Sequence, residues 1–145
     1  MIVHVTISII TLSSISEKIC LYLSHFFWLC LYNIQRMRML RELQENEFKS
    51  LVLESAIPVV IKVYAEWCPP CKQMAPGFQS VAKEFADKVS FYELNVDIAR
   101  NLAVQLGIAS IPTTLFIKDG RILAKELGYM PKDVIAEKVQ SLLAA

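Results

Sequence analysis

The chain has 145 residues, which suits a single domain, and the part from Met39 onward is by itself long enough for one compact core. Fifteen basic residues against 14 acidic residues give a net charge of +1, so the composition offers no electrostatic basis for binding nucleic acid. With only four glycines, no glycine-rich phosphate-binding loop and no internal repeat, we expect no bound cofactor.

The first 38 residues form an apolar segment that differs from the rest of the chain. Its longest apolar run, residues 19–34, is slightly short of the about 20 residues that a transmembrane helix needs. A cleavable signal peptide fits poorly, because the segment lacks positive charge at its start and small residues at a cleavage point. A membrane anchor, a translation start at Met37 or Met39, a targeting segment and a partner-binding helix all stay open.

If the segment is an anchor, the arginines that follow it place the next domain on the cytoplasmic side of the membrane. Contact with a membrane is expected only in that case. We assign no function to Cys20 and Cys30 in this segment, because ten residues apart on a helix is not one face.

Beyond residue 38 the hydrophobic pattern alternates between strands and helices. It predicts strands at residues 39–43, 59–65, 89–96, 113–118 and 121–127. It predicts helices at residues 45–55, 68–86, 98–106 and 131–143. This alternation, closed by a hairpin, predicts an α/β domain over residues 39–145, with a mixed central sheet and helices on both faces.

Residues 67–72 read Trp-Cys-Pro-Pro-Cys-Lys and place two thiols where a predicted strand gives way to a helix. The unpaired amides and positive dipole at a helix start favour a thiolate, which predicts that Cys68 is the nucleophile. Cys71, one turn later, can resolve the mixed disulfide in an intramolecular second step. Pro69 and Pro70 suit the first helical positions, but they remove amides that could stabilise the thiolate.

Zinc binding is an alternative interpretation of two cysteines at this spacing. A zinc site needs two further ligands, and Cys20 and Cys30 lie in the apolar N-terminal segment. His4 and His25 match no spacing that is familiar from zinc modules. The sequence therefore favours dithiol–disulfide chemistry over a metal site.

Three ordered motifs carry a resemblance to a known family. Residues 65–76, Ala-Glu-Trp-Cys-Pro-Pro-Cys-Lys-Gln-Met-Ala-Pro, resemble the active-site segment of thioredoxins. Residues 107–114, Gly-Ile-Ala-Ser-Ile-Pro-Thr-Thr, resemble the loop with a cis proline in that family, and residues 116–122 resemble its next hairpin. The matches span about residues 40–145 and imply the thioredoxin fold.

The resemblance also implies a substrate groove around the two thiols. It implies that the Ile111–Pro112 bond is cis, that Pro112 lies against Cys68, and that the Ile111 backbone pairs with an extended substrate segment. From the residues alone, this proline marks a turn at the entrance of a strand. The residues expected to line the groove are Trp67, Pro69, Pro70, Ile111, Pro112, Leu127 and Gly128.

Lys62 is a charged residue in the centre of an apolar strand. In thioredoxins this position usually holds a buried acid whose lysine partner comes from the next parallel strand, so the resemblance implies a Lys62–Glu93 pair with exchanged signs. We expect this pair beneath Cys71, because either charge buried alone would be costly, with the Cys71 proton passing to Glu93 or Lys62. Alternatively, Lys62 extends to solvent at an edge.

The sequence thus predicts a thiol–disulfide oxidoreductase that reduces protein disulfides through Cys68 and Cys71. A disulfide oxidase or isomerase, if the protein is exported, and a non-catalytic binding module are the alternatives. We expect disulfide-containing protein substrates, a thioredoxin-reductase-like electron donor, a cytoplasmic location and a monomer.

Overall fold

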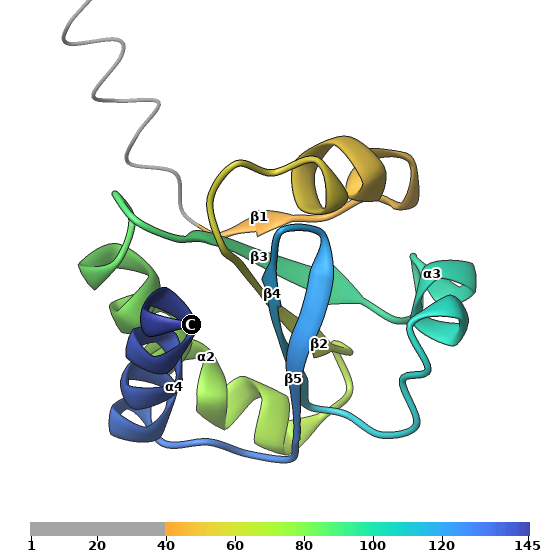
Figure 1. Cartoon of the computed structure of the whole chain (residues 1–145). Coiled ribbons are helices and arrows are strands. Elements are labelled where there is room, and N and C mark those ends of the chain that lie inside the picture. Colours follow the sequence, from red (N-terminus) through yellow and green to blue (C-terminus); the bar gives the residue numbers. More distant parts are fainter. Residues whose placement is uncertain (1–39) are drawn as a thin grey trace, which may run out of the picture. The chain divides into compact units, whose positions relative to one another are not determined.

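The computed structural model describes residues 40–145, so the interpretation of residues 1–38 as a separate segment lies outside the described residues. Within this range the strands form one sheet in the order β1-β3-β2-β4-β5 (Figure 1). β1, β3 and β2 are parallel, whereas β4 pairs antiparallel with both β2 and β5. The strands are β1 (Arg41–Glu42), β2 (Val59–Tyr64), β3 (Ser90–Asn95), β4 (Thr113–Lys118) and β5 (Arg121–Leu127).

Helices cover both faces of the sheet, which confirms the predicted fold class. One face packs against α2 (Pro69–Glu84) and α4 (Lys132–Ala144). The other face packs against α3 (Arg100–Gln105) and a short helical segment, η2 (Lys49–Leu53), which follows a 3₁₀ turn, η1 (Glu45–Glu47). The sheet therefore has an apolar core on each side.

Strand β2 is the most central element of the fold and divides its side chains between the two cores. Val60 packs into the core under α2 and α4, whereas Val59, Ile61 and Val63 pack into the core on the α3 side. Because β2 lies between β3 and β4, these side chains are buried on both faces of the sheet, as in parallel sheets covered by helices.

The helix predicted over residues 45–55 is present over residues 45–53, but it is not a regular α-helix. The chain instead makes a 3₁₀ turn, η1, followed by a π-helix, η2, in which the Glu54 amide donates to the Lys49 carbonyl five residues earlier. Two acidic side chains of the first turn bind elsewhere in the fold, since Glu47 pairs with Arg41 and Glu45 reaches the start of α3. These tertiary contacts override the helical pattern.

The β4–β5 hairpin requires glycine at its tip. Gly120 has a φ of +70°, and a Cβ atom placed on it would lie 2.8 Å from the backbone oxygen of Leu53. Side chains rarely adopt that conformation, and the clash is with backbone, so any other residue would displace the hairpin from η2.

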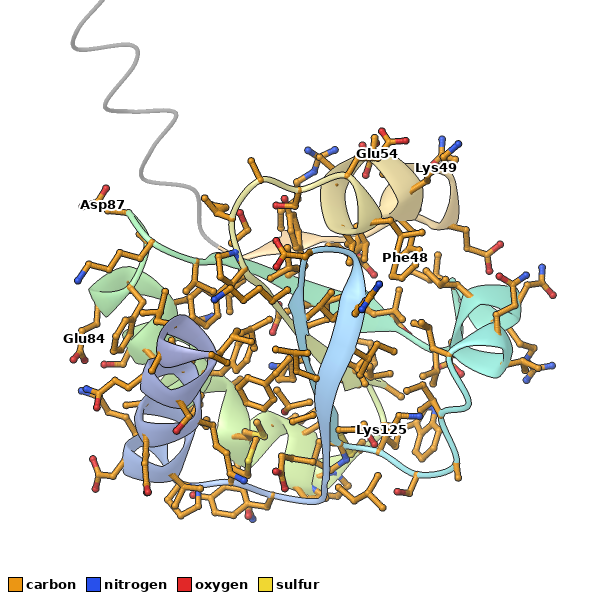
Figure 2. The ribbon with its side chains drawn as sticks, in the orientation of Figure 1. Phe48, Lys49, Glu54, Glu84, Asp87 and Lys125 are labelled. Atoms are coloured by element: carbon orange, nitrogen blue, oxygen red, sulfur yellow. A yellow bond between two sulfur atoms is a disulfide. The ribbon has the colours of Figure 1, made fainter. Side chains whose placement is uncertain are left out.

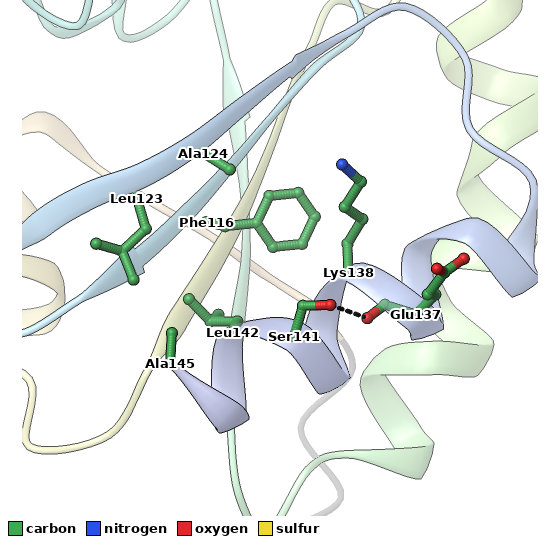
Figure 3. Close-up of a pocket in the computed structure, with 8 residues that line it drawn as sticks. All are labelled: Phe116, Leu123, Ala124, Glu137, Lys138, Ser141, Leu142 and Ala145. Atoms are coloured by element: carbon green, nitrogen blue, oxygen red, sulfur yellow. Dashed lines mark hydrogen bonds between the residues drawn. The ribbon is translucent and has the colours of Figure 1, made fainter.

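A cavity of about 290 Å³ lies between α4 and the β4–β5 hairpin (Figure 3). Phe116, Leu123 and Leu142 supply much of its apolar lining, and Glu137, Lys138 and Ser141 line its α4 side. The strand register places it toward the Ile117–Val59 end of β4 and β2, away from Thr113 and the carboxyl end of β2.

No helix of residues 40–145 is long and apolar enough to cross a membrane.

Replacing Phe78 by Ala should lower the free energy of unfolding by about 3–5 kcal/mol, because this fully buried ring packs edge-on against Phe91. Chemical denaturation of the oxidised chain measures the change. Val104→Ala, at a side chain that is 73% exposed, is the control and should change stability by no more than about 0.5 kcal/mol. Equal losses in both variants would contradict the assignment of Phe78 to the core.

Candidate active site

Cys68 and Cys71 lie where β2 leads into α2, and they form a disulfide with a Cα–Cα distance of 5.3 Å. Cys68 is the N-cap of α2 and has an extended backbone conformation. Pro69 and Pro70 occupy the first two helical positions and have no N–H group, so Cys71 supplies the first amide of the helix. That amide donates a hydrogen bond of 3.3 Å to Cys68 Sγ, which places one helical donor on the sulfur that the sequence predicts to be the nucleophile.

The disulfide is almost completely covered in the oxidised chain. Cys68 is 3% exposed and Cys71 is 2% exposed, and both pack with Ala65. Tyr64, Val96 and Ile111 are half-buried and pack against this cluster. An apolar surrounding of this kind keeps water away from the sulfur atoms.

Trp67 lies at the surface, immediately before Cys68 in the chain. Its side chain is 67% exposed, and its indole N–H donates a hydrogen bond of 2.9 Å to Asp97 Oδ2. Asp97 follows β3, so the hydrogen bond ties the active-site loop to the neighbouring strand. Sequence reasoning missed Asp97, because a carboxylate thirty residues away gives no local signal of this contact.

The loop before β4 supplies the opposite side of the site. The Ile111–Pro112 bond is cis, as the resemblance implies, and Pro112 is buried. The Pro112 carbonyl accepts a hydrogen bond of 2.8 Å from the Gly128 amide, which links the loop to the end of β5. Leu127 is 63% exposed, whereas Pro69 is exposed and Pro70 half-buried at the start of α2.

Lys62 and Glu93 face each other in register on β2 and β3. Lys62 Nζ lies 2.5 Å from Glu93 Oε1, and the two side chains are 2% and 19% exposed. The lysine ammonium also lies 5.4 Å from the ring centroids of Tyr64 and Phe78. The structure therefore brings together the two charges that the sequence analysis paired, and Lys62 does not extend to solvent.

Two further polar residues, Glu42 and Thr114, lie beside Lys62 and Glu93 on neighbouring strands, and the sequence analysis missed them. We call these four residues the charged layer. Glu42 pairs in register with Glu93, and Thr114 pairs in register with Lys62. Glu42 Oε1 and Thr114 Oγ1 are buried without a hydrogen-bond partner among residues 40–145. Leu40, an apolar residue two positions before Glu42, could have indicated a strand with Glu42 on the same, core-facing side. However, β1 has only two residues, which is too short for such a pattern to be recognised.

Tyr64 connects this charged layer to the disulfide, because its ring packs against the cysteine cluster. Burial raises the pKa of the Tyr64 phenol to about 12, and the negative charges of Glu42, Glu93 and Glu66 add to the effect. A hydrogen bond with the Asn95 side chain acts in the opposite direction on this pKa. Tyr64 is therefore a neutral phenol throughout the physiological pH range.

No group of three His, Cys, Asp or Glu side chains within residues 40–145 has the arrangement needed to hold a metal ion. The site described by the structure thus consists of a disulfide, the apolar side chains packed against it and a buried pair of opposite charges.

The model of the thioredoxin family matches residues 39–141 of the chain. The chain belongs to the thioredoxin family. It is 40% identical over 94 residues to a thioredoxin of Haemophilus influenzae, in an alignment that covers 65% of this chain and 88% of the relative. It is 38% identical over 96 residues to thioredoxin 1 of Synechococcus elongatus, covering 66% of this chain and 90% of the relative.

A plant relative is also similar over the thioredoxin region. The chain is 36% identical over 110 residues to the chloroplastic M-type thioredoxin of Spinacia oleracea. This alignment covers 76% of the chain but only 61% of the length of the spinach protein. Family membership and fold therefore rest on the thioredoxin-like part that the relatives share.

We expect Glu42→Gln to lower the pKa of Tyr64 from about 12, because it removes one of the negative charges that favour the protonated phenol. Carbon-13 NMR of labelled tyrosine, with Tyr64→Phe to assign the signal, measures this pKa directly. Glu137→Gln on α4 is the control and should leave the titration unchanged. An unaltered Tyr64 titration in Glu42→Gln would contradict the claim that the charge of Glu42 raises the pKa of Tyr64.

The raised pKa of Tyr64 also predicts a pH dependence of stability. In the unfolded chain the phenol loses its proton near its ordinary pKa of 10.0, whereas in the folded chain it keeps the proton to about pH 12. The stabilisation is therefore fully present below about pH 10 and is lost as the pH rises to about 12. Denaturation curves should show a smaller loss of stability over this range in Tyr64→Phe than in the unsubstituted chain.

Proposed function

We propose that this chain is a thiol–disulfide oxidoreductase that reduces disulfides in proteins. The observation that carries the proposal is the Cys68–Cys71 disulfide at the start of α2, in a chain of the thioredoxin family. The structure corresponds to the oxidised protein, which is the product of one round of substrate reduction.

The reaction begins with the reduced dithiol. The Cys68 thiolate attacks one sulfur of the substrate disulfide, which forms a mixed disulfide and releases the other substrate sulfur as a thiolate. The hydrogen bond from the Cys71 amide to Cys68 Sγ supports this assignment of the nucleophile, because it stabilises negative charge on that sulfur.

Cys71 completes the reaction. Its deprotonated sulfur attacks Cys68 Sγ, forms the Cys68–Cys71 disulfide and releases the second substrate sulfur, so that two electrons have passed to the substrate. The 5.3 Å separation of the two Cα atoms makes this step intramolecular. Cys71 is buried beside Tyr64, so its proton must pass to a nearby group or to entering water.

We assign the Lys62–Glu93 pair a role in this proton transfer. Glu93 is the more exposed partner of the pair, and Lys62 lies 2.5 Å from it, two residues before the end of the strand that leads into Cys68. Glu93 is our preferred acceptor of the Cys71 proton, with Lys62 setting the charge of the layer.

The substrate groove is assigned to the exposed rim of the site. Trp67, Pro69, Pro70, Leu127 and Gly128 border it, and the Ile111 backbone makes no hydrogen bond to another residue in the 40–145 range. An extended substrate segment can pair with this free backbone beside Pro112, as in strand addition. Exposed apolar side chains on both sides then hold the substrate without strict sequence requirements.

Electrons pass from the dithiol to the substrate disulfide if the protein works in a reducing compartment, so the direction of the reaction depends on where the protein is located. The relatives include bacterial thioredoxins and chloroplastic thioredoxins, and we propose that this domain likewise works in a reducing compartment such as the cytoplasm. A thioredoxin-reductase-like donor would return the disulfide to the dithiol after each round.

Cys68→Ser should abolish reduction of a disulfide-containing protein such as insulin, leaving only the background rate of dithiothreitol. Cys71→Ser should instead accumulate a covalent mixed disulfide through Cys68, because the resolving sulfur is absent. Both variants are made with Cys20 and Cys30 replaced by serine, and mass spectrometry identifies the trapped complex. Turnover by Cys68→Ser, or trapping through Cys71 instead, would contradict the assigned roles.

Lys62→Met and Glu93→Gln should move the pH midpoint of insulin reduction in opposite directions, each by about 1 unit. The first leaves Glu93 negative and opposes a thiolate, which moves the midpoint to higher pH. The second leaves Lys62 positive and moves the midpoint to lower pH, and it also lowers the maximum rate because it removes the proposed proton acceptor. Stability is measured alongside, because an unpaired buried charge can cost about 3–5 kcal/mol.

The matched control for these variants is Lys138→Met, which removes the cation of the 2.6 Å pair with Glu126 on α4 and β5. Both side chains of that pair are more exposed than Lys62 and Glu93. Its pH profile should equal that of the unsubstituted chain. Identical profiles in all four proteins would leave Lys62 and Glu93 with a structural role only.

A further inference from the structure

Helix α3 has only six residues and lacks a side-chain cap of its own. Its N-cap is Ala99, which cannot accept a hydrogen bond through its side chain. Glu45, from the turn η1 more than fifty residues earlier, supplies that acceptor. Its Oε1 accepts hydrogen bonds from the amides of Asn101, at 3.0 Å, and Leu102, at 3.3 Å. These are amides that the first turn of a helix leaves without partners.

The other end of α3 is held by a charge of opposite sign. Lys125 Nζ, from β5, donates hydrogen bonds to the carbonyl oxygens of Leu106, at 2.7 Å, and Gly107, at 3.0 Å. In Figure 2 the side chain of Lys125 lies between β5 and the loop that follows α3. The helix dipole favours negative charge at the N-terminus and positive charge at the C-terminus, so the Glu45 carboxylate and the Lys125 ammonium each lie at the end of α3 that their charge stabilises.

The segment held in this way contacts the site at both of its ends. At its beginning Asp97 accepts the indole N–H of Trp67, and at its end Ile111 packs against the cysteine cluster. Apolar side chains of this segment, among them Ala99, Leu102 and Ile108, pack against the core on the α3 side. The polar contacts of Glu45 and Lys125 add to this packing at the two ends of the helix, where backbone groups would otherwise lack partners.

We propose that Glu45 and Lys125 are positioning residues that fix residues 97–112, and with them the substrate groove. The inference rests on the proposed reduction of protein disulfides and adds residues that touch neither the sulfur atoms nor the groove. Lys125 has the more direct effect, because Gly107 lies only four residues before Ile111. Its loss loosens the loop that pairs with substrate, whereas the dithiol itself stays intact.

An ordinary surface ion pair contributes little to stability, about 0–1 kcal/mol. The contacts of Glu45 and Lys125 differ because their partners are backbone groups at helix ends. The effect we expect is therefore local and concerns binding of a large substrate. A small disulfide needs no strand pairing and should react at an unchanged rate.

The test compares Lys125→Met with Lys125→Arg, which keeps the charge and the donors, and with Lys138→Met as the matched control. Insulin and 5,5′-dithiobis(2-nitrobenzoate) serve as the large and small disulfide substrates. For insulin we expect Lys125→Met to raise KM about three- to tenfold with kcat within about twofold. Lys125→Arg should restore most of the affinity, and Lys138→Met should match the unsubstituted chain.

Hydrogen exchange gives a readout that is independent of turnover. The Gly107 amide donates to Val104 O and the Ile108 amide to Ala103 O, so both should exchange faster in Lys125→Met. Glu45→Ala should accelerate exchange at Asn101 and Leu102, and Glu54→Ala is its control, because Glu54 forms only an exposed 3.9 Å pair with Lys49.

Faster exchange together with a higher KM for insulin alone supports the proposal. An unchanged KM, or equal losses with both disulfides, overturns it, because the first shows no coupling to the groove and the second shows damage to the dithiol. If the unsubstituted chain reduces neither disulfide, the proposed function fails. In that case unchanged exchange in Lys125→Met would also overturn the positioning role.

Discussion

The rest of the structure depends on the burial of strand β2 between two helical layers. Its position between β3 and β4 forces every side chain from Val59 to Val63 into a core, including the charge of Lys62. Because a buried ammonium needs a partner, the register with β3 must place Glu93 opposite it. The same strand then ends at Tyr64 and leads directly into the Cys68 N-cap of α2, so the charged layer and the disulfide are positioned by one element.

The residues that we propose to line a substrate groove come from segments that are far apart in the sequence. Trp67 comes from the β2–α2 connection, the Ile111–Pro112 loop precedes β4, and Gly128 follows β5. The Gly128 amide donates a hydrogen bond to the Pro112 carbonyl and so joins two of these parts, whereas the Trp67 indole donates to Asp97, which follows β3. The disulfide is buried among apolar side chains, whereas the ends of the short helix α3 receive hydrogen bonds from the charged side chains of Glu45 and Lys125. In the function proposed above, the chemistry and the recognition of substrate therefore depend on different parts of the fold.

The sequence predicted the strands, the long helices and the two cysteines well, because each has a strong local signal. The β-branched run of β2 and the helix-period pattern of α2 are examples, and the Lys62–Glu93 pairing followed from the parallel neighbours that the resemblance implies. It predicted a helix where η1 and η2 lie but not their 3₁₀ and π geometry, because Glu45 and Glu47 bind distant groups there. Glu42 and Lys125 could not be predicted either, since their environment depends on strand register and on contacts between separate elements.

The most direct test of the account is the equilibrium reduction potential of the Cys68–Cys71 pair. The chain with Cys20 and Cys30 replaced by serine is equilibrated against a series of thiol–disulfide buffers, and the fraction of oxidised protein is measured by thiol labelling and mass spectrometry. A protein-disulfide reductase of a reducing compartment should have a potential of about −270 mV. A value of about −120 to −180 mV would contradict the account, because such a pair oxidises or isomerises protein disulfides instead of reducing them.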